Sequence, residues 1–311
     1  MRQATLEEYR TLSLQEAQSP TYIAFTGRHP FVTEAYDLGY AVGLRQHTSG
    51  YQHEEWPNVE LPVCFLDNDF RDPDLDAYLK LVDRYQPEVA VVGDASTKEA
   101  AERYHAAATD IRDAYSDVEP VIVPKCREAF DVLDEATVLG WPNGYANTDP
   151  FDYSDLSDWR GRPVHILGGT PHSQHDVIDL LTQPTLDEQP PADIVGLDGN
   201  AIYKAAYYGE YWTPDGYESA DHFSIRRTVR RSLEEIKGYW QDLDVWPTDT
   251  PIDRYGPAVL EPDEPVYLEH GGDIRSREDV ERAHILEHDD RVYAFESAAG
   301  KRFVAYREGW E

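Results

Sequence analysis

The chain has 311 residues, with 60 acidic and 28 basic side chains and a net charge of −32. Apolar residues make up 41% of it and aromatic residues 12%, which excludes a disordered acidic tail, because such tails are poor in both. The acidic excess instead predicts a folded protein adapted to very high salt, where a Debye length of about 3 Å at 1 M screens repulsion between like charges. On charge alone, a nucleic acid is a disfavoured partner.

The cysteine content and the apolar pattern exclude several further classes. Two cysteines, Cys64 and Cys126, are too few for a disulfide scaffold or a four-cysteine zinc module. No apolar run follows Arg2, so no signal peptide is expected. No uninterrupted apolar stretch reaches the roughly 18 residues that a membrane-spanning helix needs. These observations predict a soluble, cytoplasmic protein without a membrane partner.

Short apolar segments rich in valine, isoleucine and leucine recur through the first two-thirds of the chain. They cover residues 21–27, 40–47, 62–70, 88–94, 120–125, 136–142, 163–169 and 192–200. Most are continuously apolar, which is typical of parallel strands buried on both faces. Segments with helical spacing separate many of them, beginning at Pro73 (with Asp72 as N-cap), at Thr97 and at Ser173. Eight strands with intervening helices predict a (β/α)₈ barrel whose second and fifth crossovers are irregular.

The remainder of the chain has a different composition. A helix is expected over 219–240, followed by a linker rich in proline and aspartate over 242–265. Beyond it we expect a strand over 266–271, a helix over 276–286 and a hairpin that turns at Gly300. We therefore predict a barrel with its closing helix over 1–245, and a linker with a small α+β appendage over 246–311.

Polar residues follow several of the predicted strands at their carboxyl ends, where the catalytic groups of such a barrel lie. The set comprises Arg45, His47, Asp67, Asp69, Asp94, Lys125, Asp198 and Asn200, together with Gly140, Gly168 and Gly169. Structural roles in loops and as helix N-caps would explain the presence of about half of these aspartates. Carboxylates gathered at one mouth also suit a reaction that needs a nucleophile and an acid/base partner.

Two other chemistries have weaker support. His165, His172 and His175 lie close in sequence, but no HxH or HExxH pattern occurs, so we expect no metal and no cofactor. No G-x-S-x-G elbow is present, Cys64 lies inside an apolar strand, and nothing pairs with Cys126. A serine or cysteine nucleophile is therefore disfavoured.

The predicted helix over 219–240 carries a local exception to the acidic charge. Four arginines, Arg226, Arg227, Arg230 and Arg231, form two i,i+4 pairs on one face. Two explanations stay open. The arginines pair with Glu234, Glu235 and the acidic bulk, or they bind a phosphate backbone.

Five segments, taken in chain order, carry a family resemblance. They are CFLDNDF (64–70), VVGD (91–94), LG (139–140), HILGGTP (165–171) and ADIVGLD (192–198). Their order and spacing resemble the tRNA-guanine transglycosylase superfamily. That superfamily includes the queuine and archaeosine tRNA enzymes and relatives that insert 7-deazaguanines into DNA.

The resemblance implies a (β/α)₈ barrel that exchanges guanine in tRNA or DNA for a purine or 7-deazapurine through a covalent aspartyl-sugar intermediate. It implies Asp198 as the nucleophile, with Asp193 as the runner-up, and Asp67 as the proton-handling group. Asp94 would bind the base edge, and Lys125 stands where the family has a base-contacting glutamine. The remaining base contacts would come from Gly140, Gly168 and Gly169, and a stacking partner from Tyr145, Trp141 or Tyr203. A homodimer is compatible with this family.

Departures from the family pattern keep two other hypotheses open. Asn68 and Asp69 replace two glycines, Asn200 begins a segment that replaces Pro-Thr-Arg, and the family's zinc site is absent. A catalytically silent barrel used for binding or assembly is the second hypothesis. A metal-dependent hydrolase is the third, and it needs His165, His172 and a strand-end aspartate to meet. The transglycosylase hypothesis requires the three aspartates to converge at one mouth, and it fails if they point apart or pair with arginines.

Overall fold

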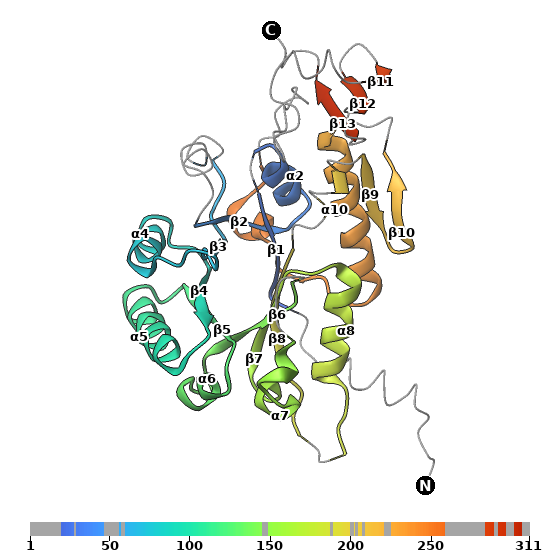
Figure 1. Cartoon of the computed structure of the whole chain (residues 1–311). Helices are drawn as coiled ribbons and strands as arrows, with labels where there is room; N and C mark the ends of the chain where they lie inside the picture. Colours follow the sequence, from blue (N-terminus) through green and yellow to red (C-terminus); the bar gives the residue numbers. More distant parts are fainter. Residues whose placement is uncertain are drawn as a thin grey trace.

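The structure is a computed structural model in which eight parallel strands close into a barrel, in the order β1 to β8 (Figure 1). It describes residues 20–27, 29–46, 56, 60–144, 149–186, 189–199, 202, 205–206, 209–220, 225–258, 284–288, 292–296 and 302–306. The strands are β1 (Tyr22–Thr26), β2 (Ala41–Arg45), β3 (Phe65–Asp67), β4 (Val89–Ala95), β5 (Glu119–Pro124), β6 (Val138–Pro142), β7 (Pro163–Leu167) and β8 (Asp193–Asp198). Each coincides with one predicted apolar segment, so the (β/α)₈ prediction is confirmed.

Helices follow most of the strands. They are α2 (Phe31–Asp37), α4 (Leu75–Tyr85), α5 (Lys98–Ala114), α6 (Arg127–Val132), the 3₁₀ turn η1 (Pro150–Asp152), α7 (Leu156–Trp159), α8 (Pro171–Thr182), α10 (Ile225–Asp242) and α11 (Pro251–Tyr255). The fifth crossover holds only the short α6, while most of the second lies outside the described residues. The sequence analysis did not predict α2.

Side-chain caps decide where three of these helices begin. Thr97, where a helix was predicted to begin, is the N-cap of α5, because its hydroxyl accepts a hydrogen bond from the Ala100 N–H. The predicted cap of α4 was wrong, since Asp74 and not Asp72 accepts from the Ala77 N–H. The start of α8 was also placed too late. Thr170 is its N-cap, and Ser173 is the third helical residue of a reciprocal capping box.

The barrel strands are apolar on both faces because two separate cores need them. One cluster fills the barrel interior and includes Tyr22, Phe65, Val91 and Val121. A larger cluster lies between the outer faces of the strands and the surrounding helices. Burial on both faces explains why the sequence shows continuous apolar runs instead of alternation.

Two glycines provide a matched test of this packing. An added Cβ at Gly43 in β2 would lie 1.8 Å from the Phe65 carbonyl oxygen, whereas one at Gly238 in α10 meets nothing within 4 Å. We expect Gly43→Ala to lower the free energy of unfolding by about 3 kcal/mol or more, because the backbone of β3 must move. Gly238→Ala is expected to raise it by about 0.5–1 kcal/mol, because alanine favours the helix. Urea unfolding measures both, and equal effects would contradict the close approach of β2 and β3.

The helix that closes the barrel begins later than predicted. It was expected from residue 219, but α10 starts at Ile225, and Ser219 ends the strand β10 (Gly216–Ser219). β10 pairs with β9 (Glu210–Thr213) in an antiparallel hairpin that the sequence analysis missed. The hairpin packs on α10, where the Trp212 N–H donates to the Ser232 hydroxyl at 3.0 Å.

Residues after α10 still pack on the barrel. The Tyr36 hydroxyl of α2 donates to the Gly256 carbonyl at 2.8 Å, and Arg254 of α11 pairs with Glu88 at 2.7 Å. Contacts with the barrel therefore extend past residue 245, where we predicted the linker to begin. No helix among the described residues is long and apolar enough to cross a membrane.

The C-terminal residues that the structure describes form a three-stranded antiparallel sheet. Its strands are β11 (His284–His288), β12 (Val292–Glu296) and β13 (Arg302–Tyr306). The predicted hairpin over β12 and β13 is confirmed. The predicted helix over 276–286 was wrong at its end, because residues 284–286 pair with β12 as a strand. Its first part, and the strand predicted over 266–271, lie outside the described residues.

Candidate functional site

Three aspartates lie at the carboxyl end of the barrel. Asp67 and Asp198 are the last residues of β3 and β8, and Asp94 is the next-to-last residue of β4. Burial raises the pKa of the Asp67 carboxyl most, and the nearby negative charges of Asp198 and Asp94 raise it further. The three carboxylates therefore face one mouth. By contrast, the runner-up nucleophile Asp193 is exposed at the first position of β8, at the opposite end of the barrel.

Asp67 is paired with a neighbouring strand end. Arg45, the last residue of β2, donates from Nε to the Asp67 carboxylate at 3.0 Å. Burial nevertheless raises the pKa of Asp67 from its ordinary value of 3.8 to about 7, and the positive charge of Arg45 opposes that rise. Asp67 can thus hold or release a proton near neutral pH. For Asp67, this arginine partner is the arrangement that counts against the transglycosylase hypothesis, whereas the partners of Asp94 and Asp198 among the described residues are Lys125 and His165.

Asp94 and Lys125 form a second charged pair in the mouth. The Lys125 Nζ lies 2.6 Å from Asp94 Oδ2, and the two residues come from the ends of β4 and β5. Burial raises the pKa of Asp94, and the ammonium group of Lys125 opposes the rise. A residue that the sequence analysis missed, Tyr153, comes from the loop after β6, and burial, together with the charge of Asp94, raises the pKa of its phenol. Its hydroxyl is buried and has no hydrogen-bond partner among the described residues.

Asp198 is held by two donors on the same oxygen. His165 Nε2 lies 3.1 Å from Oδ1, and the Gly168 N–H donates to that oxygen at 3.2 Å. His165 is fully buried in the barrel interior. The sequence analysis considered His165 only as a metal ligand. Its place in the middle of a strand does not by itself tell whether it points into the barrel, because the register of β7 and β8 shifts at this residue.

The predicted glycines fall into two groups. Gly168 and Gly169 have φ angles of +69° and +86°, so they form a turn between β7 and α8 that few other residues would adopt. This turn contacts Asp198 through the Gly168 N–H. Gly140 differs, because an added Cβ would lie 2.5 Å from Leu167 and 2.8 Å from Val123. Those side chains cover Gly140, which makes it a packing position inside the barrel.

The three histidines considered as metal ligands do not meet. His172 and His175 lie on α8, where both pack against Tyr239 of α10. His165 points into the barrel instead. Across the described residues, no group of three or more histidine, cysteine, aspartate or glutamate side chains could hold a metal ion. The geometry that a metal-dependent hydrolase needs from His165 and His172 is therefore missing.

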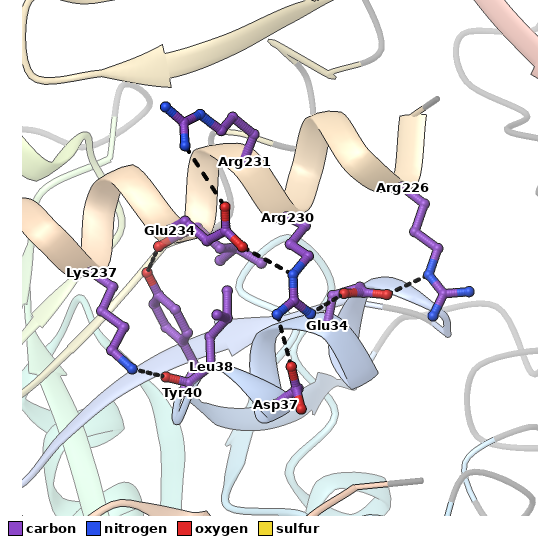
Figure 2. Close-up of polar contacts among 10 residues, drawn as sticks. Glu34, Asp37, Leu38, Tyr40, Arg226, Arg230, Arg231, Glu234 and Lys237 are labelled. Carbon is purple, nitrogen blue, oxygen red and sulfur yellow. Dashed lines mark hydrogen bonds and ion pairs between the residues drawn. The ribbon is translucent and has the colours of Figure 1, made fainter. Parts of the chain in front are cut away.

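Arg226, Arg230 and Arg231 of α10 pair with acidic side chains of the same chain (Figure 2). Arg226 and Arg230 both bind the buried carboxylate of Glu34 on α2, the latter at 2.6 Å. Arg231 pairs with Glu235 at 2.5 Å. Arg227 is exposed. Pairing with acidic residues, the simpler of the two explanations, thus accounts for Arg226, Arg230 and Arg231.

Of the stacking candidates, only Trp141 lies within the described residues. It is buried on the outer face of β6, where its ring centroid lies 4.7 Å from that of Trp159, so it does not face the mouth. Tyr145 and Tyr203 lie outside the described residues, as do His47 and Asn200. Asp69 accepts a hydrogen bond from the Arg71 N–H in a loop turn.

Comparisons with known proteins identify a family without a known activity. Among solved structures, the chain is similar to the YdjI aldolase from Escherichia coli K12, with 11% identity and a TM-score of 0.46, over 79% of this chain and 98% of that one. No curated protein matches the chain. Neither the aldolase nor the matched family is described as a transglycosylase. A family model described as a family of unknown function (DUF6610) matches residues 35–241, and the chain belongs to this family.

Proposed function

We propose that the mouth of the barrel transfers a glycosyl group between nucleobases, exchanging guanine in tRNA or DNA for a purine or 7-deazapurine. The observation that carries the proposal is a pair of carboxyl groups in one mouth with different environments. Burial raises the pKa of Asp67 to about 7, while Asp198 accepts two hydrogen bonds on one oxygen. Such a difference in environment supports Asp67 as the proton donor and Asp198 as the nucleophile.

In the first step, an oxygen of Asp198 attacks C1′ of the nucleoside. A bond forms between that oxygen and C1′, the bond from C1′ to the base nitrogen breaks, and the Asp67 carboxyl protonates the departing base. In the second step, the nitrogen of the incoming base attacks C1′ and releases the Asp198 carboxylate. The incoming base returns its proton to Asp67. The bonds and protons of the two steps balance without a redox partner or a metal.

The other charged pair suits recognition of the base. Asp94 accepts hydrogen bonds, Lys125 donates them, and their side chains are mostly buried beside each other. A purine edge presents both N–H donors and a carbonyl acceptor, so this pair complements it. Affinity would come mainly from such contacts, because counterion release contributes little at high salt and the chain carries a charge of −32.

A direct test is incubation with labelled guanine and either tRNA or DNA in molar salt. We expect label to enter one of the two nucleic acids. Absence of label from both, with folded protein, would contradict the proposal.

The pH profile tests the role of Asp67. Because the protonated carboxyl donates to the departing base, we expect kcat/KM to fall as the pH rises through about 7. The folded protein also binds this proton more tightly than the unfolded chain does. Through this group, the free energy of unfolding therefore falls as pH rises from about 4 to about 7. Asp67→Asn should remove both dependences, and a wild-type rate that stays constant from pH 6 to pH 9 would contradict the assignment.

A second candidate function is a barrel that binds its ligand without chemistry. It is favoured by the partners that the aspartates already have, namely the charged Arg45 for Asp67 and Lys125 for Asp94, and the imidazole of His165 for Asp198. Calorimetric titration with guanine distinguishes the two. Binding without exchange in either nucleic acid favours the silent barrel, and exchange rejects it.

A further inference from the structure

A chain of hydrogen bonds runs through the barrel interior to Asp198. The Tyr22 hydroxyl lies 2.6 Å from His165 Nδ1, and His165 Nε2 lies 3.1 Å from Asp198 Oδ1. The Tyr22 and Phe65 rings both lie beside the imidazole, each with its centroid 5.4 Å from that of His165, and their own centroids are 6.5 Å apart. Full burial and a hydrogen bond at each ring nitrogen leave His165 little freedom to rotate.

Two features of β7 and β8 build this arrangement. The register between the strands shifts between Val164 and His165, which pairs His165 with Gly196. An added Cβ at Gly196 would lie 2.1 Å from the Tyr22 ring, so only glycine leaves room for that ring at this level of the barrel. Asp198 follows two residues later on the same face of β8. Gly196 thus leaves the space in which Tyr22 and His165 form a chain of hydrogen bonds to the Asp198 carboxylate.

The direction of the hydrogen bonds follows from the chemistry of the groups. Burial and the charge of Asp198 raise the pKa of the Tyr22 phenol, so its proton stays on the oxygen. That proton is donated to Nδ1, and the single imidazole proton is then on Nε2, from which it is donated to Asp198 Oδ1. The opposite direction would turn a bare nitrogen lone pair toward the carboxylate.

The two oxygens of Asp198 have different surroundings. Oδ1 accepts from both His165 and the Gly168 N–H, whereas Oδ2 receives no hydrogen bond from the part of the chain that the structure describes. We propose that Tyr22 and His165 are positioning residues that hold Asp198 through Oδ1 and leave Oδ2 to attack the substrate. This inference rests on the proposed function for the identity of the attacking group.

The tautomer of His165 tests the inference without any activity measurement. In the full chain with ¹⁵N-labelled histidine, we expect the ring nitrogen shifts of His165 to show a proton on Nε2, with His165→Gln used to assign the signal. Asp198→Asn should keep this tautomer, because the amide oxygen can still accept. A proton on Nδ1, or a doubly protonated ring in the wild-type protein, would overturn the inference even if base exchange occurs.

Kinetics of conservative variants provide the second readout. We expect Tyr22→Phe to lower kcat on the order of 10²-fold with KM nearly unchanged, because misplacement of a reacting group costs this much. His165→Gln, which keeps an N–H donor, should retain more activity than His165→Leu. Tyr40→Phe is the matched control, since the buried Tyr40 hydroxyl donates to the Leu233 carbonyl far from the mouth.

The outcomes separate the two proposals. Equal kcat for wild type, Tyr22→Phe and Tyr40→Phe would overturn the positioning role while the proposed function stands. Absence of exchange in the wild-type protein would contradict the proposed function, and the tautomer measurement would still decide whether the hydrogen-bond chain exists. Thermal unfolding of each variant identifies a loss of activity that arises from misfolding.

Discussion

Replacing Asp198 with asparagine is expected to lower the rate of base exchange by about 10⁴-fold or more, because an amide cannot form the covalent bond to the sugar. The fold should be kept, since asparagine preserves the shape and can still accept from His165 and the Gly168 N–H. Exchange of labelled guanine measures the loss of activity, and thermal unfolding of the same preparation measures whether the fold is kept.

The matched control for this variant is Asp193→Asn. Asp193 begins the same strand that Asp198 ends, and it is exposed at the other end of the barrel. We expect its replacement to leave exchange within about twofold of wild type, as is usual for exposed residues away from a site. Undiminished exchange in Asp198→Asn, or equal losses in both variants, would reject Asp198 as the nucleophile.

Replacing Glu34 with glutamine is expected to lower the free energy of unfolding by about 3–5 kcal/mol, because the buried guanidinium of Arg226 then lacks its counter-charge. Glu34 and Arg226 are 4% and 5% exposed, and Arg230 binds the same carboxylate (Figure 2). The pairs join α2, after the first strand, to α10, after the last. Loss of the carboxylate thus weakens the closure of the barrel.

An exposed pair on the same helix is the control. Glu235→Gln removes the nearer of the two acidic partners of Arg231, the other being Glu234, and we expect a loss of less than about 1 kcal/mol, as for other surface ion pairs. Added salt should reduce the loss caused by Glu235→Gln more than the loss caused by Glu34→Gln, since buried ion pairs are screened much less than exposed ones. Urea unfolding at several salt concentrations measures both variants. Equal and small effects would show that the Glu34 pairs do not contribute to closure.

Most of the fold could be predicted because the barrel imposes a simple pattern. Each strand needs apolar residues on both faces, and this produced eight recognisable segments such as 88–94 and 163–169. Elements that depend on tertiary contacts were harder to predict. The hairpin of β9 and β10 is stabilised by packing on α10, and β11 depends on pairing with β12. Neither interaction leaves a strong local signal.

The acidic half of the candidate site could be predicted from strand ends, and its partners could not. Asp67, Asp94 and Asp198 follow apolar runs, so their location was readable. Tyr22 and His165 lie inside strands, where inward or outward direction depends on a register shift that the sequence does not reveal. The salt adaptation inferred from the charge of −32 stays a prediction.

The central claim is that Asp198 forms a covalent bond with the sugar of a nucleic acid. It is tested most directly by incubating the protein with tRNA or DNA without an incoming base, denaturing the mixture, and analysing the digested protein by mass spectrometry. We predict that a sugar–phosphate adduct is found on the peptide that contains Asp198 and is absent from Asp198→Asn. An adduct on another residue, or efficient exchange without any adduct, would contradict the account.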